Sequence, residues 1–205
     1  MGSFVLIIMK HYYTNNEELI SNPEQFVFHY RDHDLYFTSD NGVFSKKMID
    51  YGSRVLLNAI ELDESKVKLL DVGCGDGTFG ISLKKVYPFL EVDMVDVNNR
   101  ALDLVKENLK ANKLEANVYL SDVYENVSDQ YDVIVTNPPI RAGKEVVTKI
   151  LVQAKDHLNE NGEIWVVIQK KQGAPSAKKN LEKVFGNVEI VKRDKGYYIL
   201  KAINK

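Results

Sequence analysis

The sequence predicts one α/β domain on a mostly parallel seven-stranded sheet with helices on both faces, a C-terminal antiparallel hairpin and an N-terminal β-hairpin extension. From residue 67 onward, short apolar runs alternate with longer helical stretches, a pattern typical of a parallel sheet. The length of 205 residues suits one domain with a sizeable core. A composition that is 44% hydrophobic and 27% charged fits a globular domain and argues against disordered and fibrous classes.

The elements of the sheet follow in order along the chain. Strands are expected over residues 67–72, 91–97, 117–120, 131–136 and 163–169. The connecting helices are expected from about residue 78, over residues 99–112, from about residue 144 to 158, and over residues 177–185. Two further runs, 188–192 and 197–202, flank an Arg-Asp-Lys-Gly turn and predict the closing hairpin. Ligands of such sheets bind at the carboxyl ends of the strands, where the strand order reverses.

Residues 1–60 precede this alternation. Residues 25–38 alternate aromatic and polar side chains around an Arg-Asp-His-Asp turn, which predicts a β-hairpin. An Asp-Asn-Gly turn follows at residues 40–42, and a helix is expected over residues 45–57, extending to about residue 60. We therefore expect residues 1–60 to form an extension of hairpin and helix, packed on the domain formed by residues 61–205.

Cysteine usage and hydropathy limit the class of protein. Cys74 is the single cysteine, so the sequence allows no internal disulfide and no cysteine-rich metal cluster, and we expect a site without metal. A reducing, cytoplasmic setting is the simplest interpretation. The longest apolar run, residues 4–9, is too short to cross a bilayer, so no membrane partner is expected.

The charge is unevenly distributed along the chain. Residues 169–205 contain ten Lys and Arg against three Asp and Glu, a net charge of +7, so the whole-chain value of −2 leaves −9 on residues 1–168. Solvated, lysine-rich elements are the more common explanation of such a run. A basic face for a polyanion such as RNA also explains it. The charge alone does not choose between the two interpretations.

A glycine-rich turn follows the first predicted parallel strand, in Asp71-Val72-Gly73-Cys74-Gly75-Asp76-Gly77. Alternate glycines allow a sharp turn and a close approach to a ligand. The spacing differs from the G-x-G-x-x-G of dinucleotide sites, and an acidic residue inside the loop repels phosphate. Asp71, Gly73, Gly75 and Asp76 therefore indicate a cationic ligand without phosphate, such as S-adenosylmethionine. A purely structural glycine turn is the alternative.

The next two strands end in acidic residues. Asp96, with Val97 beside it, is placed to accept hydrogen bonds from both hydroxyls of a ribose. Capping of the following helix is the alternative, a role that Asn98 also fits. Asp122, followed by Val123, is a candidate acceptor for an adenine amino group, although Ser-Asp is also a common loop pair. A glycine turn and two acidic residues at three successive strand ends together favour a ligand site.

The fourth strand ends at Asn137-Pro138-Pro139-Ile140. Two prolines fix the backbone and remove two N–H donors, which leaves carbonyls and the Asn137 amide oxygen as rigid acceptors. The Asn137 side chain and the Pro138 carbonyl are expected to bind the two hydrogens of an exocyclic amine. They would aim its lone pair at the methyl donor and stabilise the developing positive charge. A stiff loop without chemistry is the alternative.

Together with the glycine loop, this motif resembles the class I amino-methyltransferases. The resemblance is closer to one branch, the 16S ribosomal RNA guanine-N2 methyltransferases. It covers about residues 11–203 and also rests on residues 42–45 (Gly-Val-Phe-Ser), 50–53 (Asp-Tyr-Gly-Ser), 137–143 (Asn-Pro-Pro-Ile-Arg-Ala-Gly) and 167–174 (Val-Ile-Gln-Lys-Lys-Gln-Gly-Ala). The resemblance implies a Rossmann-like class I methyltransferase fold, S-adenosylmethionine as the methyl donor and a guanine amino group as the acceptor.

The resemblance also assigns the remaining site residues. The implied catalytic residues are Asn137, Pro138, Pro139 and Ile140, of which Asn137 also borders the cofactor. The implied substrate-binding residues are Phe44, Ser45, Lys46, Arg141, Lys170 and Lys171. Many members of the family carry an aromatic residue at the position of Ile140, where it would stack on a flipped base. In this chain Phe44 or another aromatic residue would have to supply that stacking.

Three hypotheses of function follow. The leading one is an enzyme that makes N2-methylguanine in ribosomal RNA, free or in the small-subunit particle, with the basic C-terminal part and Lys46, Lys47 and Arg54 holding phosphates. Some family members carry two copies of the domain and this chain has one, so it is expected to act as a monomer or homodimer. Methylation of a protein glutamine amide uses the same acceptor geometry and is the second hypothesis. A non-catalytic module that binds S-adenosylmethionine or RNA is the third, and the intact Asn-Pro-Pro motif disfavours it.

Overall fold

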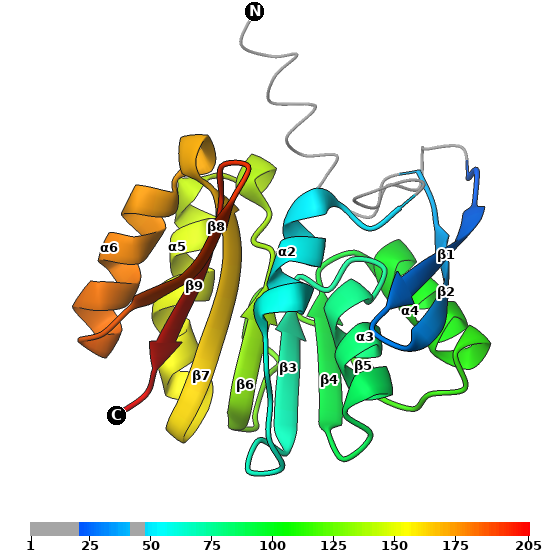
Figure 1. The fold of residues 1–205 in the computed structure, drawn as a ribbon, viewed down its shortest axis with the longest axis horizontal. Coiled ribbons are helices and arrows are strands. Elements are labelled where there is room, and N and C mark those ends of the chain that lie inside the picture. Colours follow the sequence, from blue (N-terminus) through cyan, green and yellow to red (C-terminus); the bar gives the residue numbers. More distant parts are fainter. Residues whose placement is uncertain (1–20, 42–47) are drawn as a thin grey trace, which may run out of the picture.

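The computed structural model of the protein describes residues 21–41 and 48–205. These residues form a seven-stranded sheet in the order β5-β4-β3-β6-β7-β9-β8 (Figure 1). The parallel strands are β3 (Lys68–Val72), β4 (Glu91–Asp96), β5 (Asn117–Leu120), β6 (Tyr131–Thr136) and β7 (Leu158–Gln169). The hairpin of β8 (Glu189–Asp194) and β9 (Tyr197–Ile203) joins through β9, antiparallel to β7. The predicted architecture is confirmed.

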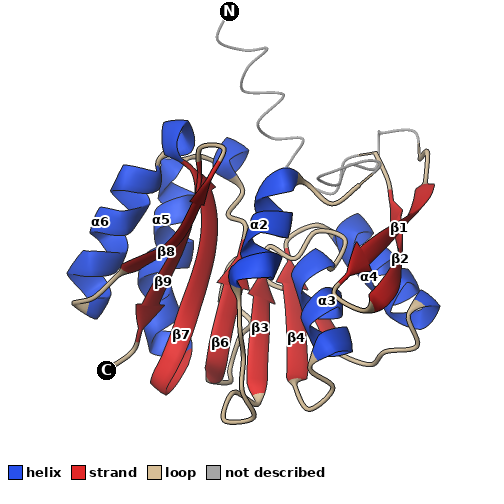
Figure 2. Ribbon diagram, viewed as in Figure 1, coloured by secondary structure: helices blue, strands red, loops and turns tan. Residues whose placement is uncertain are grey.

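Helices cover both faces of the sheet (Figure 2). One apolar cluster lies under α2 (Tyr51–Ala59), α3 (Thr78–Val86) and α4 (Asn99–Ala111), and a second lies under α5 (Lys144–Gln153) and α6 (Ala174–Phe185). Leu69 and Leu70 of β3 are both fully buried but belong to opposite clusters, because successive side chains of a strand point to opposite faces. No described helix is long and apolar enough to cross a membrane.

The largest differences from the predicted element bounds occur at three places. Helix α2 begins only at Tyr51, because Asp50 caps it and accepts from the Ser53 N–H at 3.1 Å; residues 45–47, where the helix was predicted to start, lie outside the described residues. The helix predicted to 158 ends as a 3-10 turn at residue 157, and β7 begins at 158, five residues early. Helix α6 begins at Ala174, because the left-handed Gly173 precedes it and proline suits a first helical turn.

The N-terminal hairpin is held to α4 by two asparagines. Strands β1 (Glu24–Tyr30) and β2 (His33–Ser39) pair as predicted. Asn112, the C-cap residue of α4, accepts from the Tyr36 N–H at 2.9 Å and donates to the Tyr36 carbonyl at 2.7 Å. One turn earlier, Asn108 makes the same pair of bonds to Thr38 at 2.7 and 3.0 Å. Asn108 Nδ2 also donates to the Asp76 carbonyl at 2.9 Å, so one side chain contacts both the hairpin and the glycine loop.

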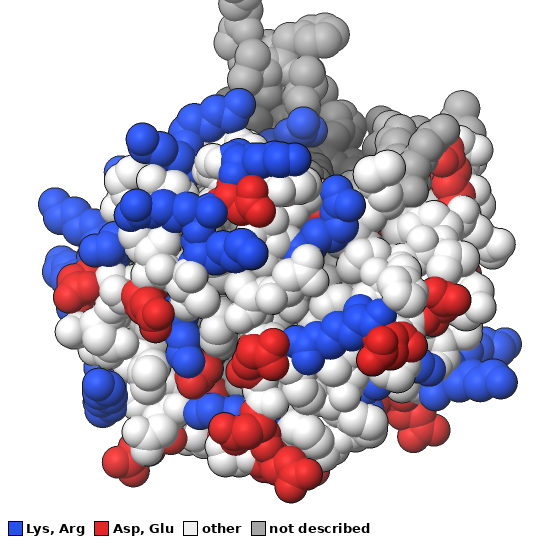
Figure 3. Space-filling view, viewed as in Figure 1, with Lys and Arg blue, Asp and Glu red and all other residues white. Residues whose placement is uncertain are grey.

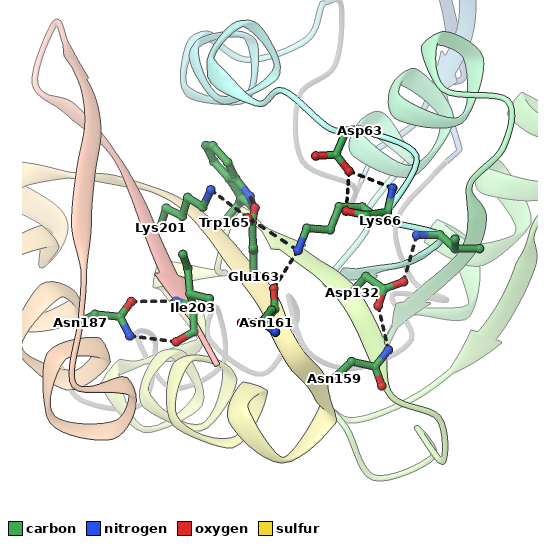
Figure 4. A network of polar contacts seen from close by, with 12 residues as sticks. Asp63, Lys66, Asp132, Asn159, Asn161, Glu163, Trp165, Asn187, Lys201 and Ile203 are labelled. Carbon is green, nitrogen blue, oxygen red and sulfur yellow. Dashed lines mark hydrogen bonds and ion pairs between the residues drawn. The ribbon is translucent and has the colours of Figure 1, made fainter. Parts of the chain in front are cut away.

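A polar network ties the strands together at the end of the sheet where they begin (Figure 4). The Asp132 carboxylate of β6 accepts from two backbone N–H groups at the start of β3, both at 2.9 Å. Lys66 Nζ donates to the Asn161 carbonyl at 2.7 Å, and Glu163 pairs with Lys201 at 2.9 Å. These contacts hold the edge opposite the predicted ligand site, so we regard them as structural.

Candidate active site

A cavity of about 240 Å³ opens at the carboxyl edge of the sheet, where the strand order reverses between β3 and β6. The predicted site residues that line it are Gly73, Gly75, Asp76, Asp96, Val97, Val123, Asn137, Pro138, Pro139, Ile140 and Arg141. Asp71, Asp122, Lys170 and Lys171 are not among the lining residues. Among the described residues, no three His, Cys, Asp or Glu side chains are grouped so as to hold a metal ion.

The glycine loop folds over the end of β4. Gly73 and Gly75 have φ values of +68° and +56°, a left-handed conformation that glycine adopts without steric cost. The N–H groups of Gly73 and Cys74 both donate to the Val95 carbonyl, at 2.9 and 3.0 Å. Gly75 N–H donates to Asp96 Oδ2 at 3.0 Å. The loop and the end of the second parallel strand therefore form one hydrogen-bonded unit facing the cavity.

Asp96 faces the cavity because another residue caps α4. The N-cap is Asn98, whose Oδ1 accepts from the Arg100 N–H at 3.0 Å. The Asp96 carboxylate instead accepts from Gly75 N–H through Oδ2 and from Asn98 N–H through Oδ1, at 3.0 and 2.9 Å. Burial raises the pKa of Asp96 above its ordinary value, against these hydrogen bonds. A carboxylate fixed in this way presents both oxygens in one orientation.

Two further buried carboxyl groups lie in or beneath the loop. Asp76 lines the cavity, and its Oδ1 accepts from Thr78 Oγ1 at 2.7 Å. Asp71 lies beneath the loop, where its Oδ2 accepts from Gly80 N–H at 2.9 Å. Burial raises the pKa of each to about 7. Asp71 Oδ1 and Asp76 Oδ2 have no hydrogen-bond partner among the described residues. Buried acceptors without partners favour a cationic ligand and disfavour phosphate.

The end of β5 supplies a different side chain from the one predicted. Asp122 turns outward, with Oδ1 3.9 Å from Lys149 Nζ, and the cavity is lined by Ser121 and Val123 instead. Val123 has a φ of +56°, which is strained for a β-branched residue. Ser121 Oγ holds this turn by donating to the Val123 carbonyl at 3.0 Å. Stored strain at a cavity wall is typical of a ligand-contacting turn.

The Asn-Pro-Pro segment follows β6 and also lines the cavity. Thr136 Oγ1 donates to the Val72 carbonyl at 2.8 Å, which joins the ends of β6 and β3. The Pro139 carbonyl is engaged, because it accepts from the Ala142 N–H of the following 3-10 turn at 2.9 Å. Asn137 Nδ2 donates to Ser53 Oγ at 3.2 Å. The motif is thereby fixed from both sides.

Several lining residues were given no role from the sequence, and two polar ones among them are Ser53 and Tyr197. Ser53 belongs to the Asp-Tyr-Gly-Ser motif at 50–53, on which the family resemblance rests. The glycine of this motif permits a close approach, because a Cβ on Gly52 would lie 2.6 Å from the Tyr197 ring. Tyr51 packs against the same ring, with centroids 5.9 Å apart. No local signal indicated Tyr197, which reaches the cavity only because β9 lies beside β7.

Basic side chains gather beside the cavity. Figure 3 shows Lys and Arg over the part of the molecule around the β8–β9 turn and α2. The exposed ones near the carboxyl edge, here called the basic patch, are Arg54, Arg141, Lys170, Lys171 and Lys195. Lys195 Nζ lies 4.7 Å from the centroid of the Tyr51 ring, and the Lys170 N–H donates to the Gly196 carbonyl at 2.8 Å. Phe44, Ser45 and Lys46 lie outside the described residues.

Known proteins resemble this chain over most of its length. The family model for the methyltransferase small domain matches residues 34–201. The Bacillus subtilis protein YbxB is 46% identical over 94% of this chain and 98% of its own length. Ribosomal RNA small subunit methyltransferase C of Vibrio cholerae is 35% identical over 84% of this chain and 51% of its own length.

A solved structure of the T. thermophilus 16S rRNA guanine N2 methyltransferase RsmC, in complex with AdoMet and guanosine, superposes with a TM-score of 0.80. It is 28% identical and covers 91% of this chain, which in turn covers 52% of that protein. A methyltransferase from Pyrococcus furiosus, 22% identical with a TM-score of 0.65, shares the fold. The chain thus spans about half the length of the ribosomal RNA methyltransferases that it matches.

Proposed function

Because this chain belongs to the methyltransferase small domain family, we propose that it transfers a methyl group from S-adenosylmethionine to guanine N2 of small-subunit ribosomal RNA. The observation that carries the proposal is the position of Asn137, Pro138 and Pro139 in the wall of an acid-lined cavity at the carboxyl edge of the sheet. The printed functions of the V. cholerae and T. thermophilus relatives supply the acceptor.

The cavity fits the proposed cofactor by its chemistry. S-adenosylmethionine carries a sulfonium, an ammonium and no phosphate, and when bound it supplies an electrophilic methyl group. The unpartnered Asp76 Oδ2 suits a cationic group, and the fixed Asp96 carboxylate suits the two ribose hydroxyls. The turn at Ser121 and Val123, in place of the Asp122 side chain, borders the space left for the adenine.

The acceptor side depends on Asn137 and Pro138. The exocyclic amine of guanine is a poor nucleophile, because its lone pair is delocalised into the ring. Asn137 Oδ1 and the Pro138 carbonyl accept its two hydrogens and stabilise positive charge on the nitrogen. S-adenosylmethionine held by Asp76 and Asp96 would supply the methyl carbon, its carbon–sulfur bond breaking as the bond to nitrogen forms, and the methylated nitrogen would then lose one proton to water. Ile140 cannot stack on a base, and the Tyr197 ring in the cavity lining provides the aromatic surface for that stacking.

The basic patch favours RNA over a protein acceptor. Methylation of a glutamine amide would use the same two acceptors but gives no role to exposed basic side chains beside the cavity. Radiolabelled methyl transfer to ribosomal RNA, 30S particles and total cell protein separates these acceptors. We expect label in ribosomal RNA that digests to N2-methylguanosine. Label in protein alone would replace the RNA proposal with the glutamine one, and no label with intact cofactor binding would favour a non-catalytic module.

We expect S-adenosylmethionine to bind more weakly as the pH falls from about 7 to about 5.5. Burial raises the pKa of Asp76 to about 7, so in this range the free protein carries a proton there, which a cationic ligand must displace. The affinity should fall by up to about tenfold per pH unit for one coupled proton. Calorimetry across this range measures it, because the ligand's own amino group stays charged there.

Asp76→Asn provides the control for this pH dependence. The amide does not titrate, so the affinity of the variant should depend less steeply on pH over the same range, where Asp71 beneath the loop, whose pKa burial also raises to about 7, still titrates. The stability of the ligand-free protein depends on pH in the opposite direction. Because folding raises the pKa of Asp76, its contribution to the free energy of unfolding is present at low pH and is lost as the pH rises from about 4 to about 7. An equally steep pH dependence in Asp76→Asn would assign the proton to another group.

We expect the double substitution of Lys170 and Lys171 with alanine to weaken RNA binding without changing cofactor binding. Both side chains are exposed in the basic patch, where phosphate contacts release counterions. The slope of log affinity against log salt should flatten by about one unit per lost contact. The same change at Lys106 and Lys110 of α4, also exposed, is the matched control. If both double variants lost RNA affinity equally, the lysines would act only through the total charge of the protein and not through local phosphate contacts.

A further inference from the structure

We infer that Ser53 is a positioning residue for methyl transfer: its hydroxyl holds the Asn137 amide so that Oδ1 faces the acceptor amine. The inference rests on the proposed function, because it assigns a second residue to the same acceptor side. It begins from one contact, the 3.2 Å hydrogen bond from Asn137 Nδ2 to Ser53 Oγ. The two residues are 84 positions apart in the sequence, and both line the cavity.

The Ser53 hydroxyl is held in place by its helix. Ser53 is only 3% exposed, and its N–H donates to the capping carboxylate of Asp50 at 3.1 Å. The next turn of α2 is anchored by Leu56 and Leu57, both fully buried. The residue before it, Gly52, has no Cβ, and this allows the Tyr197 ring to pack against the backbone there. The oxygen that meets Asn137 is therefore placed by a rigid element and not by a surface loop.

The chemistry of an amide makes this contact directional. One end of the Asn137 side chain donates and the other accepts. With Nδ2 bonded to Ser53, Oδ1 occupies the acceptor end, which is the end that can take a hydrogen from an amine. A half-turn of the amide would instead present two N–H hydrogens to the amine and repel it. In the structure Ser53 Oγ accepts from Nδ2, and this hydrogen bond holds the amide in place with Oδ1 at its other end before any acceptor binds, which is the preorganisation that a transition state requires.

Removing this hydroxyl should slow the chemical step. We expect Ser53→Ala to lower the turnover number by about 10- to 100-fold, since misplacement of a catalytic group costs rates of that order. The Michaelis constant for the acceptor and the affinity for S-adenosylmethionine should change little. Ser82→Ala is the matched control, because Ser82 is fully buried on α3 and its Oγ has no hydrogen-bond partner among the described residues. That variant should keep wild-type turnover.

A double-mutant cycle separates positioning from general destabilisation. If Ser53 acts through Asn137, Ser53→Ala should cause no further loss of rate in an Asn137→Ala background. Independent losses that multiply in the double variant would overturn the inference. The unfolding temperatures of all variants, measured with and without cofactor, show whether each rate refers to folded protein.

A readout that needs no acceptor distinguishes this inference from the proposed function. In the wild-type protein the side-chain amide protons of Asn137 should give a pair of NMR signals that exchange slowly with water, and Ser53→Ala should make them exchange faster. Unchanged exchange would overturn the positioning role even in an active enzyme. Protected amide protons in a protein that methylates no RNA would uphold the contact and reject the acceptor instead.

Discussion

Replacing Asn137 with alanine should lower the turnover number roughly 100- to 1,000-fold, the usual cost of removing one aligned polar group from a preorganised site. The amine becomes positively charged only as the methyl group transfers, so an acceptor aimed at its hydrogens is stronger in the transition state than in the ground state. Affinity for S-adenosylmethionine should remain nearly intact, because Asp96 and the glycine loop, which we propose hold the cofactor, are unchanged in this variant. The Michaelis constant for RNA should rise far less than the turnover number falls.

Single-turnover rates measure this effect directly, with calorimetry for the cofactor. Asn137→Asp is a useful companion, because it keeps the shape and places a negative charge beside the developing cation. It should retain part of the activity that the alanine variant loses. Methylation by Asn137→Ala at nearly the wild-type rate would show that the loop is scaffolding and that the mechanism proposed here is wrong.

Asp96→Ala should weaken binding of S-adenosylmethionine by about 10- to 100-fold, since the loss of hydrogen bonds to a buried ligand commonly costs about 1–3 kcal/mol. Two effects combine in this variant. The ribose loses its acceptor, and the Gly75 and Asn98 N–H groups lose the carboxylate that now holds them. The affinity for S-adenosylmethionine should therefore fall, and the glycine loop should become less ordered.

Asp103→Ala is the matched control for this substitution. Asp103 is an exposed carboxylate on α4, 3.6 Å from Lys106 and absent from the cavity lining, so its removal should leave the affinity unchanged. Calorimetry with S-adenosylmethionine and its demethylated product compares the variants. An Asp96→Ala protein that binds both as tightly as the wild type would remove the ribose assignment, and preferential binding of NAD would remove the interpretation of the whole loop.

The sequence predicted the parts of the site that follow strands directly. Gly73, Gly75, Asp96 and Asn137 were predicted to lie together because parallel strands bring their carboxyl ends to one edge, and all four line the cavity. The question of which residue caps α4 was left open by the sequence, and Asn98 answers it. In each of these cases the local pattern and the tertiary structure agree.

The parts that the sequence missed depend on packing between distant segments. Ser53 meets Asn137 only because α2 lies across the carboxyl edge, and Tyr197 reaches the cavity only through the pairing of β9 with β7. Asp122 stands at the expected strand end, yet its side chain lies 3.9 Å from Lys149, beside a left-handed Val123 that lines the cavity in its place.

Ser53 lies before residue 61, and this position limits where the protein can be cut. A cut before residue 61 is attractive by topology, because the strand–helix alternation begins only after it. Such a cut would separate Ser53 and the Asp50 cap from the loop that they support, and it would uncover the apolar side of α2, where Leu56 and Leu57 are buried. In recombination or domain grafting, the smallest transferable unit therefore begins upstream of α2. A fragment that starts at residue 61 would keep the residues proposed to bind S-adenosylmethionine but would lack Ser53, which is proposed to position Asn137.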